Sequence, residues 1–98
     1  MQKKGYKLRV PDDLAALIRN MHPNLKKKVK ASLKMIIADP DSGKTLKDEL
    51  SGLRSFRVSR FRIVYRIAGK AIEIVAIGPR ESIYQETMHL LKKEGVIR

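Results

Sequence analysis

The fold of this chain is decided by residues 54–67, which read RSFRVSRFRIVYRI. In this stretch apolar residues alternate with other residues, most of which are arginines. The alternation is interrupted once, at residues 59–60. A period of two is typical of a β-strand with one buried face, so the stretch predicts two strands. The apolar positions of this pattern are Phe56, Val58, Phe61, Ile63, Tyr65 and Ile67.

The downstream sequence predicts a third strand and a helix. Residues 68–70 (Ala-Gly-Lys) are typical of a tight hairpin turn. Residues 71–77 are apolar except for Glu73, as expected of a strand buried on both faces, and Gly78-Pro79 should end it. Residues 82–93 predict a final helix. Its inward positions would be Ile83, Thr87, Leu90 and Leu91.

The upstream sequence predicts a strand over residues 6–10 and two helices, the first starting at residues 11–13 (Pro-Asp-Asp) and the second spanning residues 25–38. These helices should form an antiparallel pair. We expect His22-Pro23-Asn24 to interrupt them, because a residue before proline resists the helical conformation. Residues 39–43 indicate a loop, and residues 46–53 are either a helical turn or irregular chain.

The predicted order β-α-α-β-β-β-α indicates an α+β fold. In it, an N-terminal helical hairpin packs on a mainly antiparallel four-stranded sheet, with the helices on one face. No linker or repeat divides the chain, so we expect a single domain over residues 1–98, with short flexible tails at residues 1–5 and 94–98.

The composition narrows the class of protein. The 98 residues contain 22 Lys and Arg against 10 Asp and Glu, a net charge of +12. This excess favours a polyanionic partner, which can be nucleic acid, an acidic protein or an anionic membrane surface. No apolar run is long enough for a membrane span, and the N-terminus lacks the apolar stretch of a signal peptide. We therefore expect a cytoplasmic protein with no membrane partner.

The residues available for catalysis are few. The chain has no cysteine and two histidines, so we expect neither a metal site nor a cofactor. No Ser-His-Asp arrangement, P-loop or HExxH motif occurs. We interpret His22 as a turn residue and His89 as a helix-surface residue that is at best a loose catalytic candidate. Cleavage of RNA by its own 2′-hydroxyl remains possible, because it needs charge relief and proton movement but no metal.

The positive charge gathers in two places. A lysine comb, which we define as Lys26, Lys27, Lys28, Lys30 and Lys34, occupies one face of the second predicted helix. Arginines crowd the predicted strands, and strand alternation would turn Arg57, Arg60, Arg62 and Arg66 away from the helices as one continuous plate. Such a plate is either a solvated face or a phosphate site; mutual repulsion favours the phosphate site.

Residues 50–67 (LSGLRSFRVSRFRIVYRI) and 74–84 (IVAIGPRESIY) resemble the RelE/ParE toxin superfamily of type II toxin–antitoxin systems. The RelE branch implies a ribosome-dependent endoribonuclease that cleaves mRNA in the A site without a metal. The resemblance also implies an acidic cognate antitoxin that wraps the toxin, and operator DNA bound through the antitoxin complex.

By position, the resemblance assigns Arg57 to holding the mRNA backbone and Arg62 to stabilising the scissile phosphate. Arg80 would stabilise phosphate or act as an acid, and Tyr84 would stack on a base or assist proton transfer. We add an expected RNA-binding set of Arg54, Arg60, Arg66 and the lysine comb (Lys26, Lys27, Lys28, Lys30 and Lys34).

Two departures from the RelE pattern leave alternatives open. A second basic residue of the RelE strand falls at Ser59 here, with Arg60 beside it, and the Glu-His pair of some ribonuclease relatives is absent. The alternatives are a ParE-like inhibitor of DNA gyrase without nuclease activity, and an inert member that binds only its antitoxin or nucleic acid.

Overall fold

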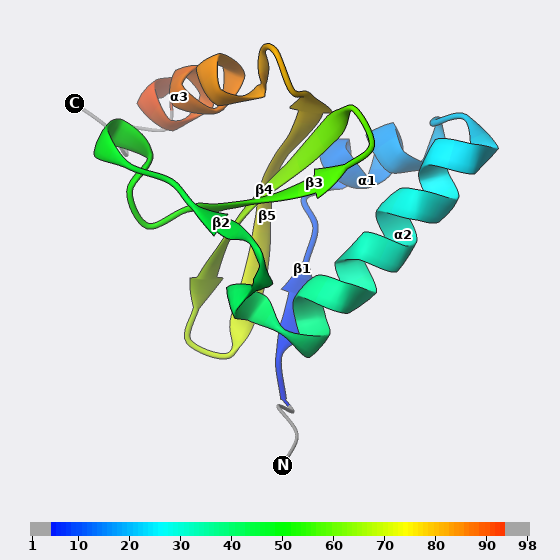
Figure 1. Cartoon of the computed structure of the whole chain (residues 1–98), viewed down its shortest axis with the longest axis horizontal. Coiled ribbons are helices and arrows are strands. Elements are labelled where there is room, and N and C mark those ends of the chain that lie inside the picture. Colours follow the sequence, from blue (N-terminus) through cyan, green and yellow to red (C-terminus); the bar gives the residue numbers. More distant parts are fainter. Residues whose placement is uncertain (1–4, 94–98) are drawn as a thin grey trace.

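The three strands predicted from residues 54–77 form the centre of the sheet in the computed structural model, which describes residues 5–93 (Figure 1). They are β3 (Arg54–Val58), β4 (Phe61–Ala68) and β5 (Ala71–Pro79), paired antiparallel in chain order. Residues 59–60 make the tight turn between β3 and β4, and Ser59 adopts a positive φ of 58° there. The predicted hairpins are thus confirmed.

Two short strands flank this centre and complete a five-stranded sheet of order β1-β5-β4-β3-β2. β1 (Lys7–Arg9) pairs parallel to β5, and β2 (Lys44–Thr45) pairs antiparallel to β3. The α+β class is confirmed, but the prediction of four strands is one short. β2 has two residues, and two residues are too few for a period of two to appear in the sequence.

The three predicted helices are present as α1 (Asp12–Arg19), α2 (Pro23–Ala38) and α3 (Ile83–Lys93). The predicted break between the first two helices is present, and His22 before the proline is extended (ψ 139°). The second helix starts earlier than predicted: Pro23 is its first residue, where the missing N–H costs no hydrogen bond. His22 caps this helix, because its Nδ1 accepts a hydrogen bond from the Asn24 N–H at 3.2 Å.

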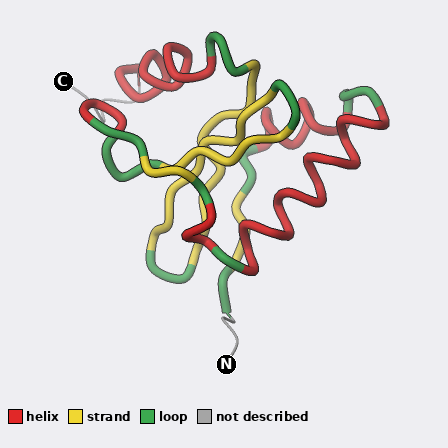
Figure 2. The backbone as a smooth tube through the Cα atoms, in the orientation of Figure 1, coloured by secondary structure: helices red, strands yellow, loops and turns green. Residues whose placement is uncertain are grey.

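The helices cover both faces of the sheet, so the prediction of helices on one face is wrong. α1 and α2 pack on the inner face, where Ile63, Tyr65 and Ile72 are fully buried. α3 packs on the outer face, and its residues Ile83 and Leu91 contact a cluster that includes Val64 and Ala76. Figures 1 and 2 show α2 and α3 on opposite sides of the central strands.

α3 covers the outer face because the outward positions of β4 and β5 include apolar residues. Val64 and Ala76 are register partners on the outer face, and both are apolar. Leaving such a pair in water would forfeit hydrophobic stabilisation, so a helix covers it. Residues 71–77 are predicted to be buried on both faces, and β5 confirms that prediction.

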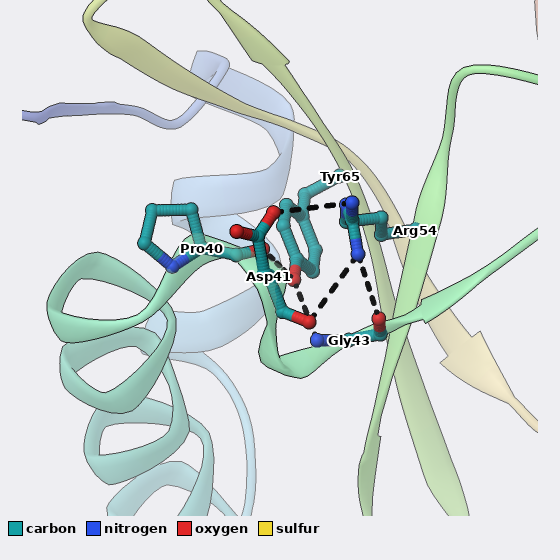
Figure 3. Close-up of polar contacts among 5 residues, drawn as sticks. All are labelled: Pro40, Asp41, Gly43, Arg54 and Tyr65. Atoms are coloured by element: carbon teal, nitrogen blue, oxygen red, sulfur yellow. Dashed lines mark hydrogen bonds and ion pairs between the residues drawn. The ribbon is translucent and has the colours of Figure 1, made fainter.

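A buried tyrosine fastens the segment after α2 to the sheet (Figure 3). The Tyr65 hydroxyl donates to the Pro40 carbonyl at 2.7 Å and accepts from the Gly43 N–H at 3.0 Å. Arg54 adds an ion pair to the Asp41 carboxylate at 3.1 Å and a hydrogen bond to the Gly43 carbonyl. Burial raises the pKa of the Tyr65 hydroxyl, which keeps it protonated and able to donate.

The predicted tails at residues 1–5 and 94–98 lie outside the described residues, except for Gly5. Among the helices of residues 5–93, none combines the length and the apolar character that a membrane crossing requires.

Replacing Tyr65 by Phe should lower the free energy of unfolding by about 1–3 kcal/mol, because the Pro40 carbonyl and the Gly43 N–H lose their buried partner. Urea denaturation followed by circular dichroism measures the change. Tyr6→Phe is the matched control, since Tyr6 is only half-buried. Equal losses in the two variants would contradict the fastening role of Tyr65.

Candidate functional site

Four arginines meet at one end of the sheet. Arg57 and Arg62 are register partners on β3 and β4, so their side chains stand next to each other on the outer face. Arg60 lies in the turn that joins these strands, and its carbonyl accepts a hydrogen bond from the Arg80 N–H at 2.9 Å. We call this set the hairpin-end arginines: Arg57, Arg60, Arg62 and Arg80.

The charges of the hairpin-end arginines are unbalanced. In the part of the chain that the structure describes, ion pairs involve Arg9, Arg54 and Arg66, and none involves a hairpin-end arginine. Like charges directly opposite each other on two strands destabilise a sheet. The Arg57–Arg62 pair is therefore a place where a bound anion, such as a phosphate, would lower the electrostatic energy.

A buried serine joins Arg62 to Tyr84. Arg62 Nη1 donates to Ser55 Oγ at 3.1 Å, and the hydroxyls of Tyr84 and Ser55 lie 3.0 Å apart. Ser55 is only 1% exposed, whereas Arg62 and Tyr84 are half-buried. α3 brings the tyrosine to this place, because Ile83 beside it is fully buried in the outer core. Tyr84 and Arg62 thus belong to one cluster.

Ser55 is a site residue that no motif in the sequence marks. Its position two residues before Arg57 shows that it shares the outer face with the arginines. This two-residue spacing is the one feature of the sequence that places Ser55 with the arginines. The burial of Ser55 is not visible in the sequence, since it comes from α3, which lies almost thirty residues further along the chain.

The predicted continuous arginine plate is divided. The side chain of Arg66 is four residues from Arg62 along β4, about 13 Å away, with the covered Val64 between them. Arg66 pairs with Glu73 at 2.7 Å, and Glu73 also contacts Arg9. Arg66 therefore lies apart from the hairpin-end arginines, and its guanidinium already has an acidic partner, which it shares with Arg9.

Arg54 also lies apart from the site. It lies on the same side of β3 as Phe56, which packs against the inner core. Its guanidinium is paired with the Asp41 carboxylate. The predicted RNA-binding roles of Arg54 and Arg66 stay predictions. In both cases the side chain already has a partner within the fold.

The lysine comb lies on α2, the helix that packs on the inner face of the sheet. The other side of α2 packs on the inner sheet face through Val29, Leu33 and Ile36. The comb residues are exposed apart from half-buried Lys26. Arg57 and Arg62 share the outer face with Ser55 and Tyr84, so the sheet lies between this arginine pair and the helix that carries the comb.

The remaining predicted candidates do not join the cluster. His22 caps α2 on the inner side of the sheet, and His89 is exposed on α3. Within residues 5–93, no group of three or more His, Asp or Glu side chains lies close enough to hold a metal ion. The groups that the fold gathers at this end of the sheet are guanidinium and hydroxyl groups.

Comparison with known proteins identifies the family of the chain. A family model, described as the ParE toxin of the type II toxin–antitoxin system parDE, matches residues 6–84. No curated protein matches the chain by sequence.

Solved structures with the same fold include both branches of the superfamily. A mutant of the Escherichia coli toxin RelE in the free state has 16% identity and a TM-score of 0.70, covering 93% of this chain and 98% of that one. The RelBE2 toxin–antitoxin complex of Mycobacterium tuberculosis has 23% identity and a TM-score of 0.67, covering 79% and 100%. The chromosomal ParDE system of Pseudomonas aeruginosa has 17% identity and a TM-score of 0.61, covering 76% and 96%.

Replacing Arg57 by Gln should raise the free energy of unfolding by about 0.2–1 kcal/mol at low ionic strength, because the variant removes the like-charge neighbour of Arg62. Urea denaturation at low and high salt measures the effect, and the gain should shrink at high salt as the charges are screened.

Arg66→Gln is the matched control on the same face, because it breaks the ion pair with Glu73. It should produce no gain in stability, and at most a small loss. A lower stability of Arg57→Gln at low salt would show that the two hairpin arginines do not repel each other in the folded protein.

Proposed function

The chain is a toxin of a type II toxin–antitoxin system and belongs to the ParE toxin family, within the RelE/ParE superfamily, and we propose that it cleaves mRNA in the ribosomal A site. In this proposal it is a ribosome-dependent endoribonuclease that inhibits translation. It acts in the cytoplasm, and its cognate antitoxin, an acidic protein that wraps it, keeps it inactive.

The observation that carries the proposal is the Arg62–Ser55–Tyr84 cluster beside the unpaired Arg57. Attack of a ribose 2′-oxygen on the adjacent phosphorus forms a 2′,3′-cyclic phosphate and breaks the bond to the 5′-oxygen. The reaction needs in-line geometry and stabilisation of negative charge on the phosphate. A guanidinium held by Ser55, with a second guanidinium and a phenol beside it, suits this chemistry.

Each residue has a role in this reaction. Arg62 donates to the non-bridging oxygens of the scissile phosphate, and Arg57 holds the neighbouring backbone phosphate. Arg80 stabilises the charge that develops on the 5′-oxygen or supplies its proton. Tyr84 stacks on a substrate base or assists proton transfer, and its half-buried ring presents one polar group toward the cluster.

The lysine comb supports a ribosomal substrate. Because α2 packs on the inner face and the Arg57–Arg62 pair lies on the outer face, the toxin has cationic groups on both sides of the sheet. A protein that enters a site lined by ribosomal RNA and reads a message there needs cationic groups on both sides. In the proposal the comb binds ribosomal RNA phosphates, and the hairpin end receives the mRNA.

A second candidate function is inhibition of DNA gyrase without cleavage of nucleic acid. The matching family model favours it, since that model describes ParE toxins. The cluster argues for the nuclease instead, because binding alone does not require an arginine and a tyrosine to be held by one buried hydroxyl. Operator DNA, bound through the antitoxin complex, is compatible with either function.

The nuclease proposal is tested with purified toxin, programmed ribosomes and an mRNA with a mapped A-site codon. The wild type should cleave at that codon, and Arg62→Ala should lower the cleavage rate by about 10²–10³-fold, because one preorganised donor to the developing charge is removed. Arg80→Ala should have a comparable effect. Primer extension locates and quantifies the cut.

Arg66→Ala is the control, since this arginine lies on the same strand and face but pairs with Glu73. It should cleave at close to the wild-type rate. An intact message with the wild type, together with inhibition of gyrase supercoiling, would reject the nuclease in favour of the second candidate function.

Neutralising part of the comb with Lys27→Gln, Lys30→Gln and Lys34→Gln should weaken ribosome binding and flatten its salt dependence. The slope of log K against log salt should fall by about 0.7–0.9 for each RNA phosphate that the comb no longer neutralises. The cleavage rate at saturating ribosomes should not change, because the comb is remote from the cluster. Binding isotherms at several salt concentrations measure the slope.

The control is a triple variant of equal net charge outside α2, with Lys44→Gln, Lys47→Gln and Lys70→Gln, all exposed residues. It should keep a slope closer to that of the wild type. The same slope in both triple variants would mean that the comb binds no more phosphates than other surface lysines.

A further inference from the structure

We infer that Ser55 is a positioning residue, which holds the Arg62 guanidinium and the Tyr84 hydroxyl in the geometry that RNA cleavage requires. The inference rests on the proposed function. Ser55 itself cannot touch an RNA substrate, because it is 1% exposed at the base of the cluster. Its hydroxyl reaches the two residues that can, at 3.1 Å from Arg62 and 3.0 Å from Tyr84.

The hydrogen-bonding capacity of the three groups makes Ser55 the shared acceptor of the cluster. A guanidinium can only donate, so Arg62 occupies one lone pair of Ser55 Oγ. Among residues 5–93, Tyr84 is the other group bonded to this oxygen, and its phenol donates to the second lone pair.

Ser55 Oγ therefore accepts from both neighbours and fixes them from one buried point. Because Tyr84 donates its hydrogen to the serine, the lone pairs of the phenol oxygen stay free to accept from a substrate group. Loss of the serine oxygen would release the Arg62 guanidinium and the Tyr84 hydroxyl together.

The surroundings of Ser55 explain why a small hydroxyl residue occupies the position. Val64 is its register partner on β4, and α3 covers this part of the face. Ser55 is thus enclosed by the same packing that delivers Tyr84. Arg57 is exposed, and the hydrogen bonds of Ser55 within residues 5–93 reach Arg62 and Tyr84 but not Arg57.

The inference predicts a separation of rate from binding. Arg57, Arg80 and the comb bind RNA through groups that do not depend on Ser55. Removal of the serine hydroxyl should therefore leave KM for programmed ribosomes within about twofold. It should lower kcat by about 10–100-fold, because a displacement of about 1 Å at a reacting centre costs this much.

The test compares Ser55→Ala and Ser55→Cys with the wild type in single-turnover cleavage on programmed ribosomes. Cysteine nearly preserves the volume but is a weak hydrogen-bonding group, so both variants should have a lower kcat. Ser32→Ala is the matched control, since that buried hydroxyl bonds the Lys28 carbonyl within α2. Wild-type kcat in Ser55→Ala, or in Ser55→Cys alone, would overturn the inference.

A double-mutant cycle identifies the route of the effect. If Ser55 acts through Arg62 and Tyr84, then Ser55→Ala should lower kcat by less than threefold in a variant that already carries Arg62→Ala and Tyr84→Phe. The full reduction of kcat in that background would overturn the positioning role. Thermal unfolding of each variant checks that all retain the fold.

A measurement without substrate separates this inference from the proposed function. Nitrogen-15 NMR of the Arg62 side chain should show hindered rotation of the guanidinium in the wild type and faster rotation in Ser55→Ala. A wild type that cleaves nothing but shows this difference would reject the nuclease and retain the positioning of Arg62. Equal rotation in the two proteins would overturn the Ser55 inference, whatever the activity.

Discussion

The packing of α3 on the outer face of the sheet is the interaction on which both the fold and the site depend. Val64 and Ala76 leave an apolar patch on that face, and Ile83 and Leu91 cover it. The helix that supplies this cover begins one residue before Tyr84, so burial of the patch fixes where the tyrosine lies. The same packing encloses Ser55 and completes its hydrogen bonds with Arg62 and Tyr84. The outer core and the site therefore depend on the same helix, and a substitution that weakens the packing of α3 would disturb both.

The positive charges that make up the net charge of +12 have different surroundings in different parts of the molecule. Arg54 and Arg66 are paired with Asp41 and Glu73, and their charge contributes to the fold. The hairpin-end arginines have no acidic partner among the described residues, and Arg57 stands opposite Arg62. That arrangement costs stability in the free protein and is relieved when an anion binds. A partner that supplies negative charge, whether RNA or an acidic antitoxin, would gain affinity from the same repulsion.

Local patterns in the sequence predict much of this architecture. The alternation in residues 54–67 identifies both strands and the outward arginines, and helical spacing identifies all three helices. The features that these patterns miss join distant segments: α3 on the outer face, Ser55 beside Tyr84, and the Tyr65 hydroxyl bound to Pro40 and Gly43. Such features depend on how elements pack in three dimensions, which a period of two or 3.6 residues does not specify. The roles of Arg57, Arg62, Arg80 and Tyr84 come from the family resemblance, and the structure adds the serine that joins two of them.

We propose that the Arg62–Ser55–Tyr84 cluster promotes attack of an RNA 2′-oxygen on the adjacent phosphate. The decisive experiment is chemical analysis of the ends of the cleaved mRNA, produced by purified toxin on programmed ribosomes in the presence of a metal chelator. The upstream fragment should carry a 2′,3′-cyclic phosphate and the downstream fragment a 5′-hydroxyl. A 3′-hydroxyl paired with a 5′-phosphate, or a message that stays intact, would contradict this proposal.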